Sequence, residues 1–160
     1  MTDEEKAFNR IKEEVGNSAH LELLGAHPPS GKSYYSDLIT FRPPKQQSTK
    51  TERDHVDLIF CSPNDIYMCE VKGRSSKSDQ DIKKLDRILQ YYEVDGVRNA
   101  IDKRLSWNSR NLDEASNVVK SIGCNTLDEV YKREEFLFIE AGRDSFEVIG
   151  HKSHSLKRLI

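Results

Sequence analysis

The apolar positions of this chain are densest between residues 55 and 72, which read HVDLIFCSPNDIYMCEVK. Two apolar runs, at about 55–61 and 66–72, flank a Ser-Pro-Asn-Asp turn. Short apolar runs bounded by turn residues are typical of buried strands joined as a hairpin. The pattern therefore predicts two paired core strands in this stretch.

Helical spacing of apolar residues marks two further segments. Thr2-Asp-Glu-Glu5 has the pattern of a capping box, and it opens a helix that we expect over about 3–15. A polar loop at 73–79 precedes a second helix, which we expect over about 79–93. The apolar face of this second helix holds Ile82, Leu85, Ile88, Leu89 and Tyr92.

The rest of the chain predicts shorter elements. A C-terminal hairpin is expected, with strands at 135–141 and 145–151 joined across Gly142-Arg-Asp. Two more strands are expected in the N-terminal third, at 20–26 and 36–44. Further helices are expected in part of 94–110, from Asn111 to Gly123, and in a short piece that begins at Thr126.

This order of elements predicts the fold class. One helix, several strands, further helices and two last strands indicate a central mixed β-sheet flanked by helices, in the α/β (α+β) class. The 160 residues suffice for a single domain over 1–160 with one sizeable core. The chain is 36% hydrophobic and 32% charged, which excludes a disordered protein.

Composition also excludes several classes of function. The net charge of −2 gives no global positive field, so any surface that binds nucleic acid must be local. The 3 cysteines have no CxxC spacing, which argues against a disulfide framework and a zinc ribbon. No stretch approaches the roughly 18 apolar residues of a membrane span. The polar start predicts no signal peptide. We therefore expect a cytoplasmic protein without membrane partners, which could be a cellular protein or a viral protein in an infected cell.

Charged residues interrupt the first hairpin. If its turn centres on Pro63-Asn64, the numbers of opposed residues add up to 127, and Asp57 then faces Glu70. Opposed residues in a sheet have Cβ atoms about 5 Å apart. Lys72 follows Glu70 by two positions and shares its face. The sequence therefore predicts two carboxylates and one ammonium group on one side of the hairpin.

Two opposed carboxylates destabilise a sheet unless a cation offsets their repulsion. Lys72 is one candidate for that cation, and Mg²⁺ is a better one because it prefers carboxylate oxygens and keeps several waters. A metal ion beside a lysine is equipped to hydrolyse a phosphodiester. The metal lowers the pKa of a bound water, and the lysine holds that water or stabilises the growing charge on the phosphate.

The arrangement of Asp57 with Glu70-Val71-Lys72 resembles the PD-(D/E)XK nuclease superfamily, which has an Asp at the start of one strand and ExK on the next. The frame VDLIF and IYMCEVK is similar to archaeal Holliday junction resolvases, restriction endonuclease-like proteins and RecB-type nuclease domains. Val56 stands where the motif has Pro. The resemblance implies a restriction endonuclease-like fold.

The resemblance also implies roles for individual residues. Asp57 and Glu70 would bind Mg²⁺, with Mn²⁺ as a substitute, and the backbone carbonyl of Val71 would assist. Lys72 would be catalytic together with the two acids. Many members have a further acid on the helix before the first core strand, for which Glu4 and Glu14 are candidates here. The expected substrate is nucleic acid, with DNA favoured, and family analogy adds a homodimer that cuts two strands.

A basic strip on and before the second predicted helix is the candidate surface for nucleic acid. Its side chains lie next to the motif in sequence and could contact phosphates without reading bases. The alternative is a solvated helix face. The candidates are Arg74, Lys77, Gln80, Lys84, Arg87 and Tyr91.

Other interpretations of the charged hairpin stay open. A charged chain produces acid-x-Lys triplets by chance, and Glu4-Glu5-Lys6 and Asp81-Ile82-Lys83 are two that need no explanation as polar helix starts. The third triplet, at Glu70, could be a salt-bridged edge of a sheet. The two alternatives to a nuclease are therefore a catalytically inactive nucleic-acid-binding module with the same fold and a structural or interaction domain.

Overall fold

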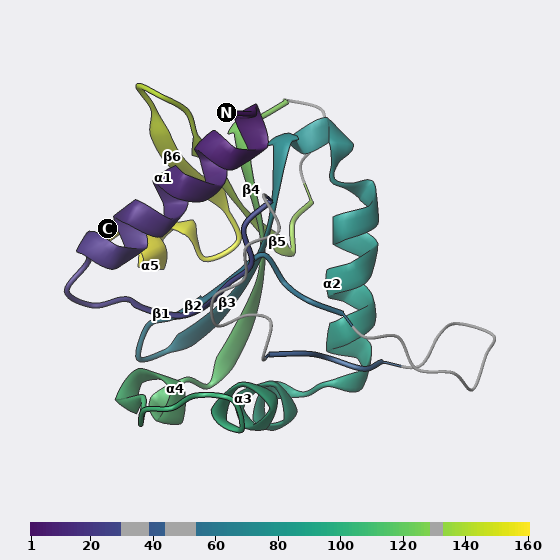
Figure 1. Ribbon diagram of the computed structural model, residues 1–160, viewed down its shortest axis with the longest axis vertical. Helices are drawn as coiled ribbons and strands as arrows, with labels where there is room; N and C mark the ends of the chain where they lie inside the picture. Colours follow the sequence, from purple (N-terminus) through teal and green to yellow (C-terminus); the bar gives the residue numbers. More distant parts are fainter. Residues whose placement is uncertain (30–38, 44–53, 129–132) are drawn as a thin grey trace.

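A mixed β-sheet of six strands organises the part of the chain that the computed structural model describes, residues 1–29, 39–43, 54–128 and 133–160 (Figure 1). The strands lie in chain order, from β1 at one edge to β6 at the other. β3, β4 and β5 run parallel, and every other neighbouring pair is antiparallel. The strands are β1 (Glu22–Ala26), β2 (Leu58–Cys61), β3 (Asp65–Arg74), β4 (Asn117–Thr126), β5 (Phe136–Ala141) and β6 (Phe146–Gly150).

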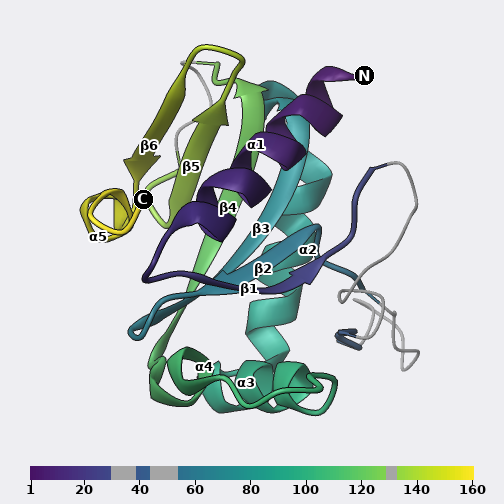
Figure 2. The same ribbon diagram turned by 60° about the vertical axis from the view of Figure 1, so that its left-hand side comes forward.

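Helices cover both faces of the sheet, which confirms the predicted α/β class (Figures 1 and 2). The helices are α1 (Asp3–Asn17), α2 (Asp79–Tyr91), α3 (Val94–Asp102), α4 (Arg110–Glu114) and α5 (Ser153–Lys157), and a short 3₁₀ turn, η1 (Ser75–Lys77), precedes α2. Within the described ranges, no helix has the length and apolar character needed to cross a membrane.

The β2–β3 hairpin has the predicted register. Leu58 pairs with Cys69 and Cys61 pairs with Ile66, so the numbers of opposed residues add up to 127. The turn is closed by the Ser62 N–H, which donates to the carbonyl oxygen of Asp65 at 2.9 Å. Because a strand alternates its side chains, this register decides which residues of β3 face each layer of helices.

Two apolar clusters fill the two sides of the sheet. On one side, Ile66 and Met68 of β3 pack with α2, α3 and α4. On the other side, Tyr67, Cys69 and Val71 pack with α1 and α5. Glu70 and Lys72 continue the first of these alternating rows, so they lie on the α2 side of the sheet.

The first helix starts as its sequence predicts. The backbone N–H of Glu5 donates to Thr2 Oγ1 at 3.1 Å, and the Thr2 hydroxyl donates back to Glu5 Oε1 at 3.2 Å. The first of these bonds satisfies one of the N–H groups that the first turn of a helix leaves unpaired, and the second holds the two side chains together. The N-terminus of α1 lies beside the end of β3, near the N-terminus of α2 (Figure 2).

The helix predicted from Asn111 to Gly123 is wrong. The helical part is only α4, and residues 117–126 form β4, which pairs with both β3 and β5. The run Asn-Val-Val is rich in β-branched residues, whose stiff side chains favour strands. The pairing partners on both sides then outweigh the polar residues that made the segment look helical.

Two other predicted elements lie partly outside the described residues. Of the strand expected at 36–44, only 39–43 are described, and there Phe41 forms a single antiparallel bridge with Asp54. Of the short helix expected from Thr126, residues 129–132 are outside the description, and Thr126 itself ends β4.

The half-buried carboxylate of Glu22 joins the α3–α4 layer to the edge strand β1. Glu22 accepts hydrogen bonds from the Trp107 indole N–H at 2.7 Å and from the Ser109 hydroxyl at 2.6 Å. Ser109 also caps α4, because its hydroxyl accepts the N–H of Leu112 at 3.1 Å. The segment between the two helices is thereby held against the sheet.

Candidate active site

Asp57 and Glu70 meet where β2 begins. Asp57 directly precedes Leu58, and continuing the register of the hairpin places it opposite Glu70. The Asp57 side chain accepts the backbone N–H of Val71 at 2.8 Å, because the chain leaves the β2–β3 ladder at this point and frees that N–H. The predicted juxtaposition of the two acids is therefore present, with Asp57 held by a hydrogen bond to β3.

Glu70 is nearly fully buried, with 2% of its surface exposed. Burial raises the pKa of Glu70 well above its usual range, and the neighbouring Asp57 carboxylate raises it further. Lys84 opposes both effects and lowers this pKa in part. Two close carboxylates, one of them buried, form a site at which a cation is strongly favoured.

Lys84 of α2 supplies a cation to this pair. Its Nζ atom lies 2.7 Å from Glu70 Oε1 and donates to the backbone carbonyl of His55 at 2.8 Å. Burial alone would lower the pKa of Lys84, but the Glu70 carboxylate outweighs that effect and the pKa is raised. The sequence predicted that Lys72 would pair with the hairpin acids and that Lys84 would contact phosphate. In the structure Lys84, not Lys72, forms the ion pair with Glu70.

Lys72 lies between two acids from different helices. Its Nζ atom is 3.7 Å from Glu4 Oε1 of α1 and 3.7 Å from Asp81 Oδ2 of α2. Its side chain is 37% exposed, so the ammonium group is open to solvent and to a ligand. Burial lowers the pKa of Lys72, but the surrounding carboxylates, with Asp81 and Glu4 the strongest, together raise it by more, and the ammonium form is favoured at neutral pH.

Asp81 is a functional candidate that the sequence interpretation missed. It is 7% exposed, and burial raises its pKa to about 6 although Lys72 and Lys84 pull it down. The buried Oδ2 atom accepts no hydrogen bond. The apolar spacing of α2 already contained this information. One face of the helix, with i, i+3, i+4, i+7 spacing, holds Asp81, Lys84, Leu85 and Ile88. Asp81 and Lys84 therefore lie on the buried side of α2.

The structure separates the two candidates for the helix-borne acid. Glu4, in the first turn of α1, contacts Lys72 as described above. Glu14, near the other end of the same helix, instead pairs with Arg10 at 3.0 Å. Ten residues of helix span about 15 Å, so the two acids cannot serve the same site.

The predicted basic strip is divided between paired and open side chains. Arg74 pairs with Asp128 at 2.5 Å, and Arg87 binds both carboxylate oxygens of Asp54, at 3.0 and 2.8 Å. Three other members are exposed and remain available to a ligand. These are Lys77, Gln80 and Tyr91.

The donor chemistry of the Asp57–Glu70 pair fits Mg²⁺. This ion commonly uses one or two carboxylates and completes its shell with waters and substrate phosphates. Among the described residues no group of three or more His, Cys, Asp or Glu side chains is gathered for a metal ion, so the pair would have to act with water and substrate. Lys84 would have to yield Glu70 Oε1 to the metal.

Comparison of the chain with models of protein families, with curated proteins and with solved structures found no match. The geometry of the site is therefore the basis of the functional argument.

Proposed function

We propose that this chain is a Mg²⁺-dependent nuclease of the PD-(D/E)XK type, with DNA as its favoured substrate. The observation that carries the proposal is the convergence of Asp57 and Glu70 at the start of β2, with Lys72 two positions further along the same face of β3. Glu4 on α1 adds the helix-borne acid that the resemblance implies.

In this proposal Asp57 and Glu70 hold the metal, assisted by the carbonyl of Val71. When bound, Mg²⁺ polarises the phosphate and lowers the pKa of a coordinated water. Lys72 is protonated, because its pKa is raised by Asp81 and Glu4 against the effect of burial. It would therefore serve as a positive charge that holds the attacking water or stabilises the phosphate oxygens in the transition state.

Glu4 and Asp81 act through Lys72 as positioning residues. Each lies 3.7 Å from the ammonium group, and they approach from helices on opposite faces of the sheet (Figure 2). Two carboxylates on two rigid helices restrict the rotamers of a long, flexible side chain. Asp57 and Glu70 are also near enough to Lys72 to raise its pKa, so the three motif residues form one electrostatic unit.

The test is cleavage of a panel of linear duplex, supercoiled plasmid, single strand, branched junction and RNA, in Mg²⁺, Mn²⁺ or EDTA. Asp57→Asn, Glu70→Gln and Lys72→Met should each abolish metal-dependent cutting. Glu4→Gln should slow cutting, whereas Glu14→Gln on the same helix should not. Wild-type protein that cuts none of these substrates with either metal, or Asp57→Asn protein that cuts as wild type does, contradicts the proposal.

One observation favours a second candidate, a nucleic-acid-binding module without catalysis. Lys84 already neutralises Glu70 at 2.7 Å, as a structural cation would in a site that has lost its metal. Such a module would bind nucleic acid equally well in EDTA and in Mg²⁺. A structural or interaction domain would bind none even at low salt, where phosphate contacts are strongest.

A further inference from the structure

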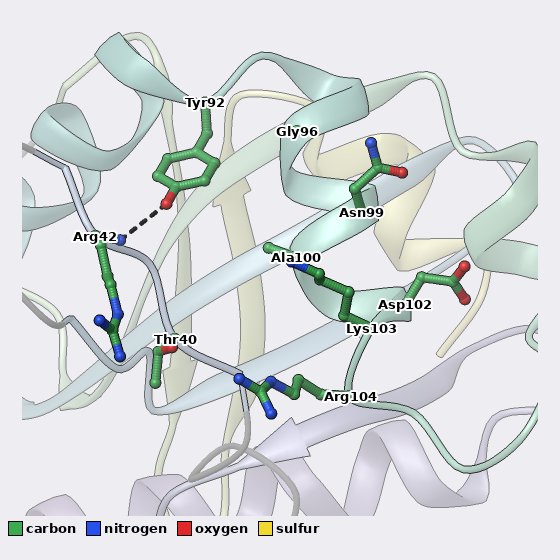
Figure 3. A pocket seen from close by; sticks show the side chains of 9 residues that line it. All are labelled: Thr40, Arg42, Tyr92, Gly96, Asn99, Ala100, Asp102, Lys103 and Arg104. Atoms are coloured by element: carbon green, nitrogen blue, oxygen red, sulfur yellow. Dashed lines mark hydrogen bonds between the residues drawn. The ribbon is translucent and has the colours of Figure 1, made fainter.

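A polar pocket lies beyond the C-terminal end of α2, on the side of the fold that carries α3 (Figure 3). Its volume is about 760 Å³, and its walls come from Thr40 and Arg42, from Tyr92 and from α3 with the turn that follows. We call it the α3 pocket. Three of its lining side chains are cationic, Arg42, Lys103 and Arg104, against one acid, Asp102.

The cations of the α3 pocket are open to a ligand. Arg42, Lys103 and Arg104 are exposed, and none of them forms an ion pair with a carboxylate of the described residues. In Figure 3, Thr40 lies between the guanidinium groups of Arg42 and Arg104. Two guanidinium groups and a hydroxyl around one hollow are donors suited to phosphate oxygens.

The backbone that carries Arg42 is fixed to Asp54 and to the end of α2. The Arg42 N–H donates to the Tyr92 hydroxyl at 2.9 Å, and the Tyr92 ring packs edge-on against Phe41, with centroids 5.3 Å apart. Phe41 exchanges two backbone hydrogen bonds with Asp54, at 3.0 and 2.7 Å. Asp54 in turn is held by Arg87 of α2.

These contacts connect the α3 pocket with the candidate active site along a single helix. Lys84, which contacts Glu70, and Tyr92, which lines the pocket, are eight residues apart, so about 12 Å separates them along α2. A nucleic-acid strand advances about 3.4 Å per nucleotide along a duplex axis, so this span corresponds to three or four nucleotides. A strand cut near Glu70 would bring a later phosphate to the pocket.

We infer that the α3 pocket is a subsite for the phosphate backbone of the nucleic-acid strand that the active site would cut. This inference rests on the proposed function. A small-molecule site is usually enclosed and mostly apolar, whereas the donors of this pocket are exposed. Contacts of that kind position a strand without reading its sequence.

The experiment measures binding of a labelled DNA duplex, a single strand and an RNA duplex to the full chain in EDTA, by fluorescence anisotropy over a range of salt. Arg42→Ala/Arg104→Ala is compared with Lys157→Ala/Arg158→Ala, which removes the same charge from exposed positions at the C-terminal end of α5. For the DNA duplex, loss of two phosphate contacts should make the negative slope of log K, the binding constant, against log salt shallower by about 1.8. It should also weaken binding of every sequence alike. The α5 variant should keep the wild-type slope, and Arg104→Glu should weaken binding further than alanine does.

Each outcome decides the inference. An unchanged slope in the Arg42/Arg104 variant, or an equal fall in both double variants, overturns it, because the effect is then absent or reflects net charge alone. If wild type binds but does not cut in Mg²⁺ or Mn²⁺, catalysis fails while a selective loss in the pocket variant still supports the subsite. If wild type binds none of the three probes at the lowest salt, both proposals fail. Binding of inorganic phosphate alone, without any effect of the pocket variant on nucleic acid, also overturns the subsite.

Discussion

Glu70 and Lys84 are the closest ion pair of the candidate site, with 2.7 Å between Oε1 and Nζ, although they come from different elements and lie 14 positions apart in the chain. Lys72, which follows Glu70 by two positions, pairs instead with Glu4 and Asp81. The site therefore consists of two groups of opposite charges, the Glu70–Lys84 pair and the triad of Lys72, Glu4 and Asp81. One is buried under α2, and the other is open at the end of the sheet.

Replacing Lys84 should leave the buried Glu70 carboxylate without its cation and lower the stability of the fold. Breaking a buried pair by removal of one partner typically costs about 3 kcal/mol. We expect Lys84→Met to lower the free energy of unfolding by about that amount at pH 8, measured by urea denaturation. Lys83→Met, one position away and exposed, should change it by less than about 0.5 kcal/mol.

The same substitution has a pH signature. Without Lys84 the pKa of Glu70, already raised by burial and Asp57, rises further. A carboxyl whose pKa is higher in the folded state than in the unfolded state destabilises the fold as pH increases. The loss in Lys84→Met should therefore shrink toward pH 5, and Glu70→Gln added to it should restore most of the stability at pH 8. An equal loss at both pH values would show that Lys84 acts by packing alone.

Asp81 should behave as a functional residue that weakens the fold. Its folded pKa is raised from 3.8 to about 6, so its contribution to stability is full below pH 4 and is lost as the pH passes 6. A shift of this size corresponds to about 3 kcal/mol. We expect Asp81→Asn to stabilise the protein at pH 8 but not at pH 4, in urea denaturation at both pH values.

The control for Asp81 is Asp113→Asn, which removes the same charge from an exposed position on α4. If the proposed function holds, Asp81→Asn should also slow cutting, because Lys72 loses one of its two positioning carboxylates. A variant that is stabilised and cuts at the wild-type rate would show that Asp81 has no part in positioning Lys72.

Metal binding should be visible without any substrate. A ligand present at 100 times its dissociation constant stabilises the folded state by about 2.7 kcal/mol. We expect Mg²⁺ to raise the melting temperature of wild type, and Asp57→Asn to abolish the rise. Since Lys84 competes with the metal for Glu70, Lys84→Met should reach its full rise at lower Mg²⁺. An identical Mg²⁺ response in wild type and Asp57→Asn would place any bound metal elsewhere.

Close approach of α1 to the sheet depends on Gly123 of β4. A Cβ atom at this position would clash with Ile11 Cδ1 and touch Cys69 and Val71. We expect Gly123→Ala to cost about 1–3 kcal/mol of unfolding free energy, as overpacking of a core does. Gly16→Ala is the matched control, because nothing lies within 4 Å of its added Cβ and helix propensity predicts a gain of about 0.5–1 kcal/mol. Ile11→Val in the Gly123→Ala background should recover part of the loss if the clash is the cause.

The sequence was most informative where local rules agree with each other. The Ser-Pro-Asn-Asp turn and the two apolar runs determine the hairpin register, and that register predicts that Asp57 lies opposite Glu70. The capping box of Thr2 and Glu5 likewise predicts the start of α1. These features depend on neighbours within a few residues, so a single sequence contains them.

Features that depend on distant partners were missed. Residues 117–126 form a strand because β3 and β5 pair with both of its edges, and no local pattern reveals those neighbours. The pairing of Lys84 with Glu70 required knowing which face of α2 meets the sheet. The apolar spacing that contains Asp81 and Lys84 did carry this information, but their charge made an exposed position the simpler interpretation.

The chain has one tryptophan, Trp107, and its indole N–H is bound to Glu22 of β1. Its fluorescence therefore has a single origin, at the junction of the edge strand with the segment that leads from α3 to α4. Lys103 and Arg104 of the α3 pocket lie four and three positions, respectively, before this fluorophore. The protein thus contains its own optical reporter for the layer that carries the pocket, and its emission can be followed without a label.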